Sequence, residues 1–472
     1  MTFASLSFLI YFLPITVILC AISPAGWRKT ILLTMSVIFY LASAGAYDLL
    51  LLLFVATSDY LLARWLFRTE HKAFVLALSV TINVSILVFY KYAPFFAGVI
   101  DDAAARMFSR DLQFARHTLH LVLPLGISFF VFETLAYIVD IYRGTTKPAR
   151  RWTDYATYLT FFPHLIAGPI YRYSDVAKVL SAPLQMVPQA VVTGLFLFAF
   201  GLWKKVFVAN PMGEIADIAF GRSADVIGTR ETWLGALAYT FQIYFDFSGY
   251  STMAIGLGRI FGIPLPENFN EPYTSRSITD FWRRWHMSLA AWLRDYVYIP
   301  LGGNREGPWR TYRNLIIVFV LCGLWHGANY TFLLWGLMHG ALLIAERAGL
   351  KVERWLPGFL SQLVCFFLIV LTWVMFRADT VTKATAFYHS MFVYTVHEGE
   401  LIPYFAALEG PRAPLAASFG LLSLVSFRSL FSAVEPDEKM LAFKMAGTVV
   451  LVAVSMLILV AETFNPFIYY RF

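Results

Sequence analysis

The sequence predicts an all-α protein that crosses a membrane many times. Of its 472 residues, 59% are hydrophobic and only 14% charged, whereas an ordinary globular domain is about 25% charged. The 44 Phe, 25 Tyr and 13 Trp supply the aromatic side chains that gather at lipid headgroups. This composition excludes a soluble protein, a disordered chain and a nucleic-acid binder. Residues 1–472 are therefore predicted to form one integral membrane domain.

Membrane spans are predicted where about 20 mostly apolar residues follow one another, enough to cross about 30 Å of hydrocarbon. The apolar segment 155–170 is interrupted by Pro163, Gly168 and Pro169, and such a segment is tolerated only where protein or a water-filled cavity covers its backbone. We therefore expect about ten to thirteen spans, with re-entrant pieces and amphipathic helices. The candidates are Phe3–Ile22, Thr30–Ser43, Tyr47–Phe67, Ala73–Tyr90, His117–Ile141, Ala190–Val208, Trp233–Ile260, Asn314–Asn329, Thr331–Glu346, Gly358–Phe376, Leu415–Leu430 and Leu441–Ala461.

Basic residues predict the orientation, because cytosolic loops are enriched in Lys and Arg. They occur at every second loop near the N-terminus, which places the N-terminus outside. Lys439 and Lys444 precede the last span, which places Phe472 outside as well. The basic residues of the N-terminal loops are Arg28, Lys29, Arg64, Arg68, Lys72, Arg143, Lys147, Arg150 and Arg151.

Residues 268–313 are the least lipid-like stretch and are predicted to be cytosolic. Ser277 followed by Asp280 resembles a capping box that opens a helix. Apolar residues at helical spacing then predict one amphipathic helix at the membrane surface, ended by Pro300. His286 falls in its apolar stripe and is expected to point into the protein or the bilayer. The stripe consists of Ile278, Trp282, Trp285, Leu289, Leu293 and Tyr296.

The arginines of this stretch leave two interpretations open. In one they bind lipid phosphates, and His286 is a hydrogen-bonded core residue. In the other they form a platform for an anionic donor that carries a nucleotide, because guanidinium groups bind phosphate in a bidentate geometry. The arginines are Arg276, Arg283, Arg284, Arg294, Arg305, Arg310 and Arg313.

Two apolar segments contain a histidine next to the last glycine of a G-x-x-x-G pattern, His326 in 323–327 and His339 in 336–340. Close helix packing explains the glycines, and we interpret the second segment in that way. Packing does not explain an imidazole at membrane depth, where ionisable groups are costly and typically functional. His326 lies 13 residues past Arg313, roughly 20 Å of helix rise. A neutral histidine there suits a general base that takes a proton from an attacking hydroxyl.

The remaining histidines and the cysteines predict no further site. No His, Cys and carboxylate spacing matches a metal site, so no metal is expected. His164, beside Pro163, is interpreted as a structural residue of a bend. The cysteines all lie in apolar runs, which argues against a disulfide framework.

These motifs resemble the membrane-bound O-acyltransferases, in their bacterial branch of alginate O-acetyltransferases. The resemblance covers nearly the whole chain, and its most specific part is RRWH at 283–286 followed 40 residues later by LWHG at 324–327. The other matching stretches are 123–144, 161–173, 244–273, 277–305, 322–340 and 373–379.

The resemblance implies a helical bundle around a transmembrane tunnel and the transfer of an acetyl group from cytosolic acetyl-CoA, with no tightly bound cofactor. His326 would be the acyl-transfer histidine, which activates a hydroxyl that attacks the thioester, and His286 the second motif histidine. We expect His286 or Asn329 to orient the hydroxyl or stabilise the oxyanion, and the role of Asn329 is our own hypothesis, which the resemblance does not imply. The expected substrate-binding residues are Arg283, Arg284, Trp285, Arg294 and Asn329.

The C-terminal residues 465–472 resemble an aromatic motif of related members, and of small companion proteins in teichoic-acid D-alanylation. There a motif tyrosine carries the acyl group onward, and the matching position here is Tyr469. This segment, expected in the periplasm, fits equally well an aromatic anchor at the membrane interface.

The resemblance also implies the surroundings of the protein. We expect the bacterial inner membrane, contact with membrane lipid, a periplasmic SGNH-type acetyltransferase partner and a polysaccharide-export complex. The main function expected is O-acetylation of an exopolysaccharide such as alginate. The alternative is D-alanyl or acetyl transfer to a cell-wall polymer, either teichoic acid or peptidoglycan. A transporter without chemistry also fits the spans, but the paired motif histidines argue against it.

Overall fold

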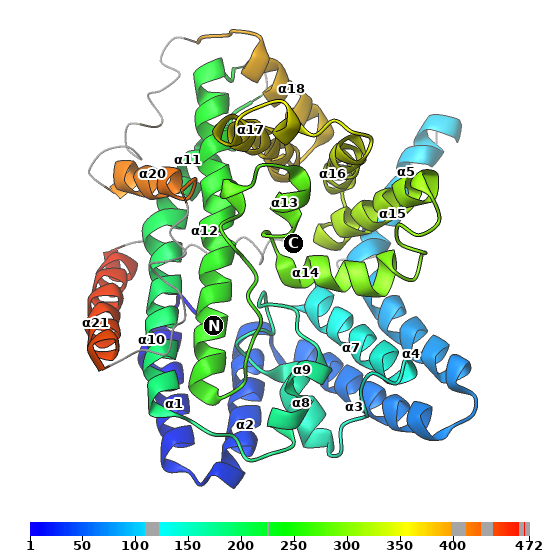
Figure 1. The fold of residues 1–472 in the computed structure, drawn as a ribbon, viewed down its shortest axis with the longest axis vertical. Helices are drawn as coiled ribbons and strands as arrows, with labels where there is room; N and C mark the ends of the chain where they lie inside the picture. The colour runs from blue at the N-terminus through cyan, green and yellow to red at the C-terminus, as the bar shows by residue number, and fades with distance from the viewer. Residues whose placement is uncertain are drawn as a thin grey trace. The chain divides into compact units, whose positions relative to one another are not determined.

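The fold is described from a computed structural model (Figure 1). It describes residues 1–108, 122–223, 226–397, 404, 412–425, 438–461 and 467. Within these ranges the chain is mostly helical and has no β-strand, which confirms the predicted all-α class. The chain divides into two units, and each is described by itself. The first comprises 1–191, 258–265 and 327–329, and the second comprises 192–257, 266–326 and 330–472.

The first unit is built mainly from the N-terminal helices, blue to cyan in Figure 1. A buried polar cluster joins α3 to α4, because Asp59 accepts hydrogen bonds from Ser79 Oγ at 2.6 Å and from Asn83 Nδ2 at 3.0 Å. The elements of the first unit are η1 (Phe8–Phe12), α1 (Leu13–Ile22), α2 (Ala25–Ala44), α3 (Ala46–Arg68), α4 (Lys72–Leu87), η2 (Val88–Tyr92), α5 (Ala93–Phe108), α7 (Ile127–Tyr142), α8 (Trp152–Thr160) and α9 (Tyr173–Leu180).

The interrupted apolar segment follows α8 in this unit. Residues 161–170 are not helical, yet every one of them is buried. A Cβ on Gly168 would lie 2.2 Å from Cα of His164, so only glycine fits this turn. His164 is itself fixed, with Nδ1 3.1 Å from Glu133 Oε1 and Nε2 3.0 Å from the Tyr158 carbonyl oxygen. The prediction of a broken segment covered by protein is confirmed, and His164 has the surroundings of a structural residue.

The second unit contains α12, the long green helix of Figure 1, which packs against α10 where glycines allow it. A Cβ on Gly201 would lie 2.5 Å from the Gly249 carbonyl oxygen. The elements of the second unit are α10 (Pro188–Trp203, whose first turn belongs to the first unit), η3 (Lys204–Ala209), α11 (Asn210–Gly221), α12 (Thr229–Phe261, whose end belongs to the first unit), η4 (Pro272–Thr274), α13 (Ile278–Trp282), α14 (Met287–Leu293), η5 (Arg294–Tyr298), α15 (Pro308–His326), α16 (Tyr330–Arg347), η6 (Val352–Arg354), α17 (Gly358–Arg377), α18 (Val381–Phe392), α20 (Arg412–Leu422) and α21 (Glu438–Ala461).

Five helices of the described chain are long and apolar enough to cross a membrane, so a multi-pass membrane protein is confirmed. The predicted count of ten to thirteen spans stays a prediction. The predicted span His117–Ile141 starts too early, because residues 122–126 form a turn before α7 and residues 109–121 lie outside the described ranges. The five helices are Ala46–Arg68, Lys72–Ala105, Pro188–Gly221, Gly358–Arg377 and Met440–Ala461.

Helices α15 and α16 approach each other through the two G-x-x-x-G patterns. A Cβ on Gly336 would lie 2.1 Å from the Phe319 carbonyl oxygen, and one on Gly323 would lie 2.2 Å from that of Phe332. Any side chain at either position would collide with the backbone of the other helix. The packing interpretation of these glycines is therefore confirmed, and it fixes the helix that carries His326.

A buried ion pair joins η3 to α12 in the second unit. Lys205 Nζ lies 2.5 Å from Asp246 Oδ1, and both side chains are almost completely buried. The same ammonium lies 4.8 Å from the ring centroid of Phe467, which also packs edge-on against Tyr250 at 5.2 Å. Phe467 is thus anchored by a cation–π contact and an aromatic contact on α12.

Asp246→Asn should destabilise the protein by about 3–5 kcal/mol, because it removes the negative charge beside a buried ammonium. The measurement is thermal unfolding in detergent. Asp379→Asn is the control, because Asp379 is 70% exposed and its contact with Lys383 spans 3.6 Å, so its loss should cost less than about 1 kcal/mol. Equal shifts in the two variants would contradict the role of the buried pair.

Candidate functional site

The motif region does not form the single amphipathic helix that the sequence predicts. Helix α13 has only five residues, α14 starts at Met287, and His286 between them has the left-handed conformation, with φ 43° and ψ 53°. Such a conformation costs a residue other than glycine about 1–3 kcal/mol and persists where the surroundings hold it. Of the predicted capping box, the Ser277 half is confirmed, because Ser277 Oγ accepts a hydrogen bond from the Asp280 amide at 3.1 Å.

A loop that precedes η4 holds this break in place. The amide of Asn270 donates to the Arg284 carbonyl oxygen at 2.9 Å, and the amide of Met287 donates to the Asn268 carbonyl oxygen at 3.0 Å. These bonds satisfy backbone groups that a continuous helix would have paired internally. The helical spacing of 278–296 gives no indication of them, because the partner is a separate segment of the chain.

The side chain of Asn268 is buried at the centre of this arrangement. Its Oδ1 lies 3.1 Å from His286 Nδ1 and accepts hydrogen bonds from Ser288 Oγ at 2.9 Å and from the Ser288 amide at 3.3 Å. Its Nδ2 donates to Ser251 Oγ on α12 at 3.1 Å. Asn268 thus connects α12, its own loop and the His286 break. The sequence analysis did not single out Asn268. The only signal for it was that it lies in the stretch 244–273, which resembles the family.

His286 is fully buried, as the apolar stripe predicts. Its ring packs edge-on against Phe247 of α12, at 4.7 Å between centroids, and against Trp325 of α15 at 5.8 Å. Burial disfavours the charged imidazolium and lowers the pKa of His286 to about 3. The imidazole is therefore neutral at physiological pH.

His326 is the last residue of α15 and is only 4% exposed. Three aromatic rings surround it, with centroids at 4.8 Å for Trp325, 5.1 Å for Trp335 and 5.2 Å for Phe376. These rings come from three different helices, α15, α16 and α17. The structure therefore places this imidazole in a desolvated aromatic environment.

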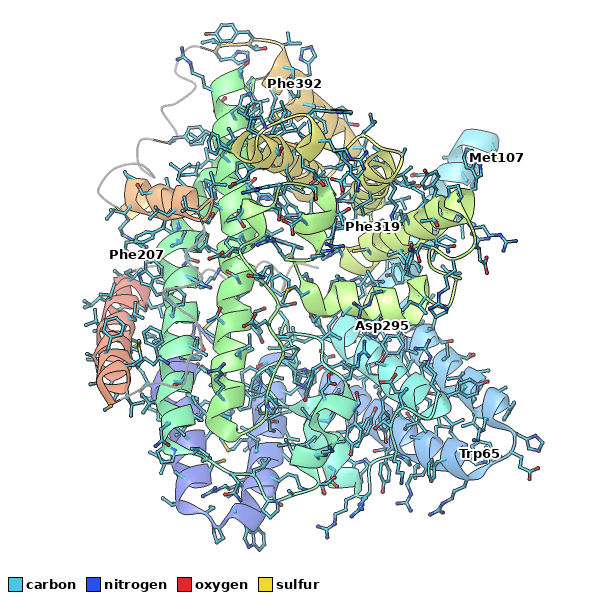
Figure 2. All side chains as sticks on the ribbon, viewed as in Figure 1. Trp65, Met107, Phe207, Asp295, Phe319 and Phe392 are labelled. Carbon is cyan, nitrogen blue, oxygen red and sulfur yellow. The ribbon has the colours of Figure 1, made fainter. Side chains whose placement is uncertain are left out.

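Two tryptophans link the buried histidines into one cluster. The Trp325 ring contacts both His286 and His326, so one indole packs against both motif histidines. The Trp335 ring contacts His326 and, at 4.9 Å, His339. His339 also accepts a hydrogen bond at Nδ1 from the Trp282 indole at 3.2 Å, and its ring lies 6.1 Å from that of Phe319, labelled in Figure 2. The sequence indicated His339 only as part of a packing motif.

The predicted donor-binding residues 283–285 and Arg294 differ in exposure. Arg283 is exposed, whereas Arg284 is half-buried and pairs with Asp280 at 3.0 Å. Arg294 is exposed and pairs at 2.7 Å with Asp295, which Figure 2 labels. Trp285 is only 2% exposed and packs in the aromatic core, 4.9 Å from the Trp373 ring. Arg283 and Arg294 are thus accessible to an anion, and Trp285 is a core residue in this structure.

The roles of two further predicted site residues stay predictions. Asn329 lies in the turn 327–329 between α15 and α16, which belongs to the first unit. Tyr469 lies outside the described residues. Among the residues that are described, no three His, Cys, Asp or Glu side chains gather in a way that would hold a metal ion, and the expectation of a metal-free site stays a prediction.

The cluster is suited to proton transfer in the absence of bulk water. Aromatic side chains that line a site exclude water from it and strengthen electrostatic interactions inside it. A neutral imidazole can accept the proton of a hydroxyl and return it to a leaving group. The buried histidines therefore fit acyl transfer to a hydroxyl.

Comparison with known proteins agrees with this chemistry. Residues 151–376 match the model of the membrane-bound O-acyltransferase family. Two relatives are named probable alginate O-acetylase. The one from Azotobacter vinelandii is 43% identical over 84% of this chain and 78% of its own length. The one from Pseudomonas putida is 39% identical over the full length of both chains. A peptidoglycan O-acetyltransferase of Helicobacter pylori is 38% identical over 75% of this chain and 71% of its own length.

Proposed function

The chain belongs to the membrane-bound O-acyltransferase family and is an O-acyltransferase, and from that premise we propose its reaction. It moves an acetyl group from cytosolic acetyl-CoA across the bacterial inner membrane for O-acetylation of an exopolysaccharide such as alginate. The observation that carries this proposal is the pair of buried motif histidines, His286 and His326, that share the Trp325 ring. The relatives named alginate O-acetylase support the choice of acyl group and polymer.

His326 acts as the general base. Its imidazole takes the proton of the attacking hydroxyl as the oxygen bonds to the thioester carbonyl carbon. The tetrahedral intermediate then expels the CoA thiolate, which receives the proton from the imidazolium. Asn329 is the proposed donor to the oxyanion, and His286 is the second imidazole of the reaction.

The donor binds through exposed arginines of the motif region. Arg283 and Arg294 are accessible, and their guanidinium groups suit the phosphates of acetyl-CoA. Reversing one of these charges replaces attraction by repulsion. Arg283→Glu should therefore raise the KM for acetyl-CoA about tenfold, the effect of about 1.4 kcal/mol, with a smaller change in kcat. Arg354→Glu, an exposed arginine of η6, is the control and should leave the KM unchanged; equal effects would remove Arg283 from the donor site.

Tyr469 carries the acetyl group onward from the histidine site. The contact that supports this role is Phe467, two positions earlier, which is buried against Tyr250 on the helix that also bears the His286 neighbour Phe247. Tyr469→Phe removes the only hydroxyl at this position. The variant should still bind acetyl-CoA with an unchanged KM for its slow hydrolysis, but should transfer no acetyl group to a polymer. Full transfer by the variant would favour a purely anchoring role for the segment.

The surroundings follow from this reaction. Both termini of the chain are periplasmic, as the basic loops indicate, and the donor site at residues 268–313 is cytosolic. A periplasmic SGNH-type acetyltransferase receives the acetyl group, within a polysaccharide-export complex. Membrane lipid surrounds the bundle.

The alternative is transfer of an acetyl or D-alanyl group to a cell-wall polymer, which the peptidoglycan O-acetyltransferase relative favours for acetyl. D-alanyl transfer is less favoured, because those systems supply the aromatic motif on a separate small protein. The experiment supplies purified protein in detergent with acetyl-CoA or with D-alanyl carrier protein and measures thiol release. Thiol release from acetyl-CoA alone supports the proposal, and release from the carrier protein alone supports D-alanyl transfer.

A further inference from the structure

The hydrogen bonds of Asn268 determine which of its two amide atoms faces His286. The Ser288 amide points at this atom from 3.3 Å, and a backbone N–H can only donate. The atom must therefore be the oxygen, and the NH₂ group faces Ser251 Oγ at 3.1 Å. The flipped amide would place two donors against each other.

The same oxygen determines the tautomer of His286. It lies 3.1 Å from Nδ1, and a carbonyl oxygen can only accept, so Nδ1 carries the proton. In the neutral imidazole the lone pair is then on Nε2. Nε2 is completely buried and has no hydrogen-bond partner within the described part of the chain. A buried acceptor without a partner is costly, so this lone pair is available to the hydroxyl or N–H of a ligand.

The described contacts of the His286 ring are with uncharged groups. Phe247, Trp325 and Asn268, from three different elements, contact the ring. Among the titratable groups of the elements packed around it, Asp246 pairs with Lys205, and Arg284 with Asp280. Further charged or titratable residues on these elements are Glu267 and Glu271 in the Asn268 loop, Arg283 before His286, Arg294 and Asp295 after α14, Arg230, Glu231 and Arg259 on α12, and Arg310, Arg313 and His326 on α15.

We propose that Asn268 is a positioning residue, which holds His286 as the Nδ1–H tautomer so that Nε2 accepts a hydrogen bond from the hydroxyl that is acylated. This inference rests on the proposed acyl transfer. It gives the two histidines different roles: His326 removes the proton of the attacking hydroxyl, and His286 orients the oxygen of that hydroxyl. It also excludes neutral His286 as the donor to the oxyanion, because its only N–H is already engaged with Asn268. The burial that keeps His286 weakly basic fits an orienting group better than a base.

The test compares two replacements of Asn268. Asn268→Leu removes the acceptor at similar volume, so the ring loses its fixed tautomer, and kcat should fall about 10²-fold, as for a misplaced reacting group. Asn268→Asp keeps an acceptor but adds a charge that stabilises the imidazolium. It should keep most of its activity at pH 8 and lose activity on acidification, at a pH where the wild type is still fully active. Because only the neutral ring has a lone pair on Nε2, the activity must fall as pH falls.

Repeating the Asn268→Asp substitution in a His286→Gln variant distinguishes a positioning role of Asn268 from a structural role. In His286→Gln, the substitution Asn268→Asp should no longer add a pH dependence, because the titrating group is gone. The same added pH dependence in both backgrounds would overturn the proposal. So would an Asn268→Leu variant with unchanged kcat.

A spectroscopic measurement keeps the inference testable if acyl transfer from acetyl-CoA is never observed. The ¹⁵N NMR spectrum of histidine-labelled protein, with His286→Gln to assign the signals, should show an unprotonated Nε2 for His286 at pH 7. In Asn268→Asp the protonated ring should appear as pH falls. A protonated Nε2 in the wild type would contradict the inference, whereas absent transfer with the expected spectrum would contradict only the proposed function.

Discussion

His326→Ala should abolish detectable acetyl transfer while the protein still folds and inserts. Loss of a general base lowers the rate by about 10²–10⁴-fold. The buried aromatic surroundings increase the effect, because no bulk water is present to replace the imidazole. The measurement is transfer of labelled acetyl from acetyl-CoA, with protein amount and melting temperature determined for each variant.

His339→Ala is the matched control for this result. His339 is as deeply buried, lies in the neighbouring helix α16 and contacts the same Trp335 ring. Its removal leaves the Trp282 indole without its acceptor, so the melting temperature should fall, whereas transfer per folded molecule should be retained. Loss of transfer in His339→Ala but not in His326→Ala would show that the base has been assigned to the wrong histidine.

Gly336→Ala should strongly disrupt the packing of α15 against α16. Its Cβ would lie 2.1 Å from the Phe319 carbonyl oxygen, so α15 and α16 must separate. Overpacking of a tight core typically costs about 1–3 kcal/mol, and more where backbone has to move. We expect a strongly lowered yield or melting temperature, together with lost transfer, because α15 carries His326 at its end. Size-exclusion chromatography and thermal unfolding in detergent measure the effect.

Gly340→Ala, one turn further along α16, is the control for this variant. Its Cβ would meet the Cδ1 methyl of Ile316 at 3.1 Å, the end of a flexible side chain that can move. The substitution should be tolerated with a small change in melting temperature. Equal damage from both alanines would mean that the helix pair is sensitive to any added volume and not to the backbone contact.

The sequence predicted the helices well because length and hydropathy determine them locally. The ends of α2, α3 and α17 lie within five residues of the predicted spans. The interrupted segment 161–170 was also predictable, because Pro163, Gly168 and Pro169 cannot continue a helix. The burial of His286 was predicted from the apolar stripe, although the stripe assumed one continuous helix, and that of His326 from its position 13 residues past Arg313 in an apolar segment.

The remaining features depend on contacts between distant parts of the chain. Helical spacing across 278–296 predicts one helix, but the Asn268 loop supplies hydrogen bonds that break it at His286. The contact of Trp325 with both histidines depends on how α15 packs, which the spacing of its residues does not contain. An asparagine in a polar loop has no pattern of its own, so Asn268 became a candidate only through its geometry.

The central claim is that an acetyl group enters from one side of the membrane and leaves on the other. The most direct test reconstitutes the protein in liposomes, selects one orientation, and supplies labelled acetyl-CoA only to the face that bears residues 268–313. Labelled acetyl should then appear on an acceptor enclosed on the opposite side, in the wild type but not in His326→Ala. Label that stays on the side of supply, or that crosses equally well in His326→Ala, would contradict the account.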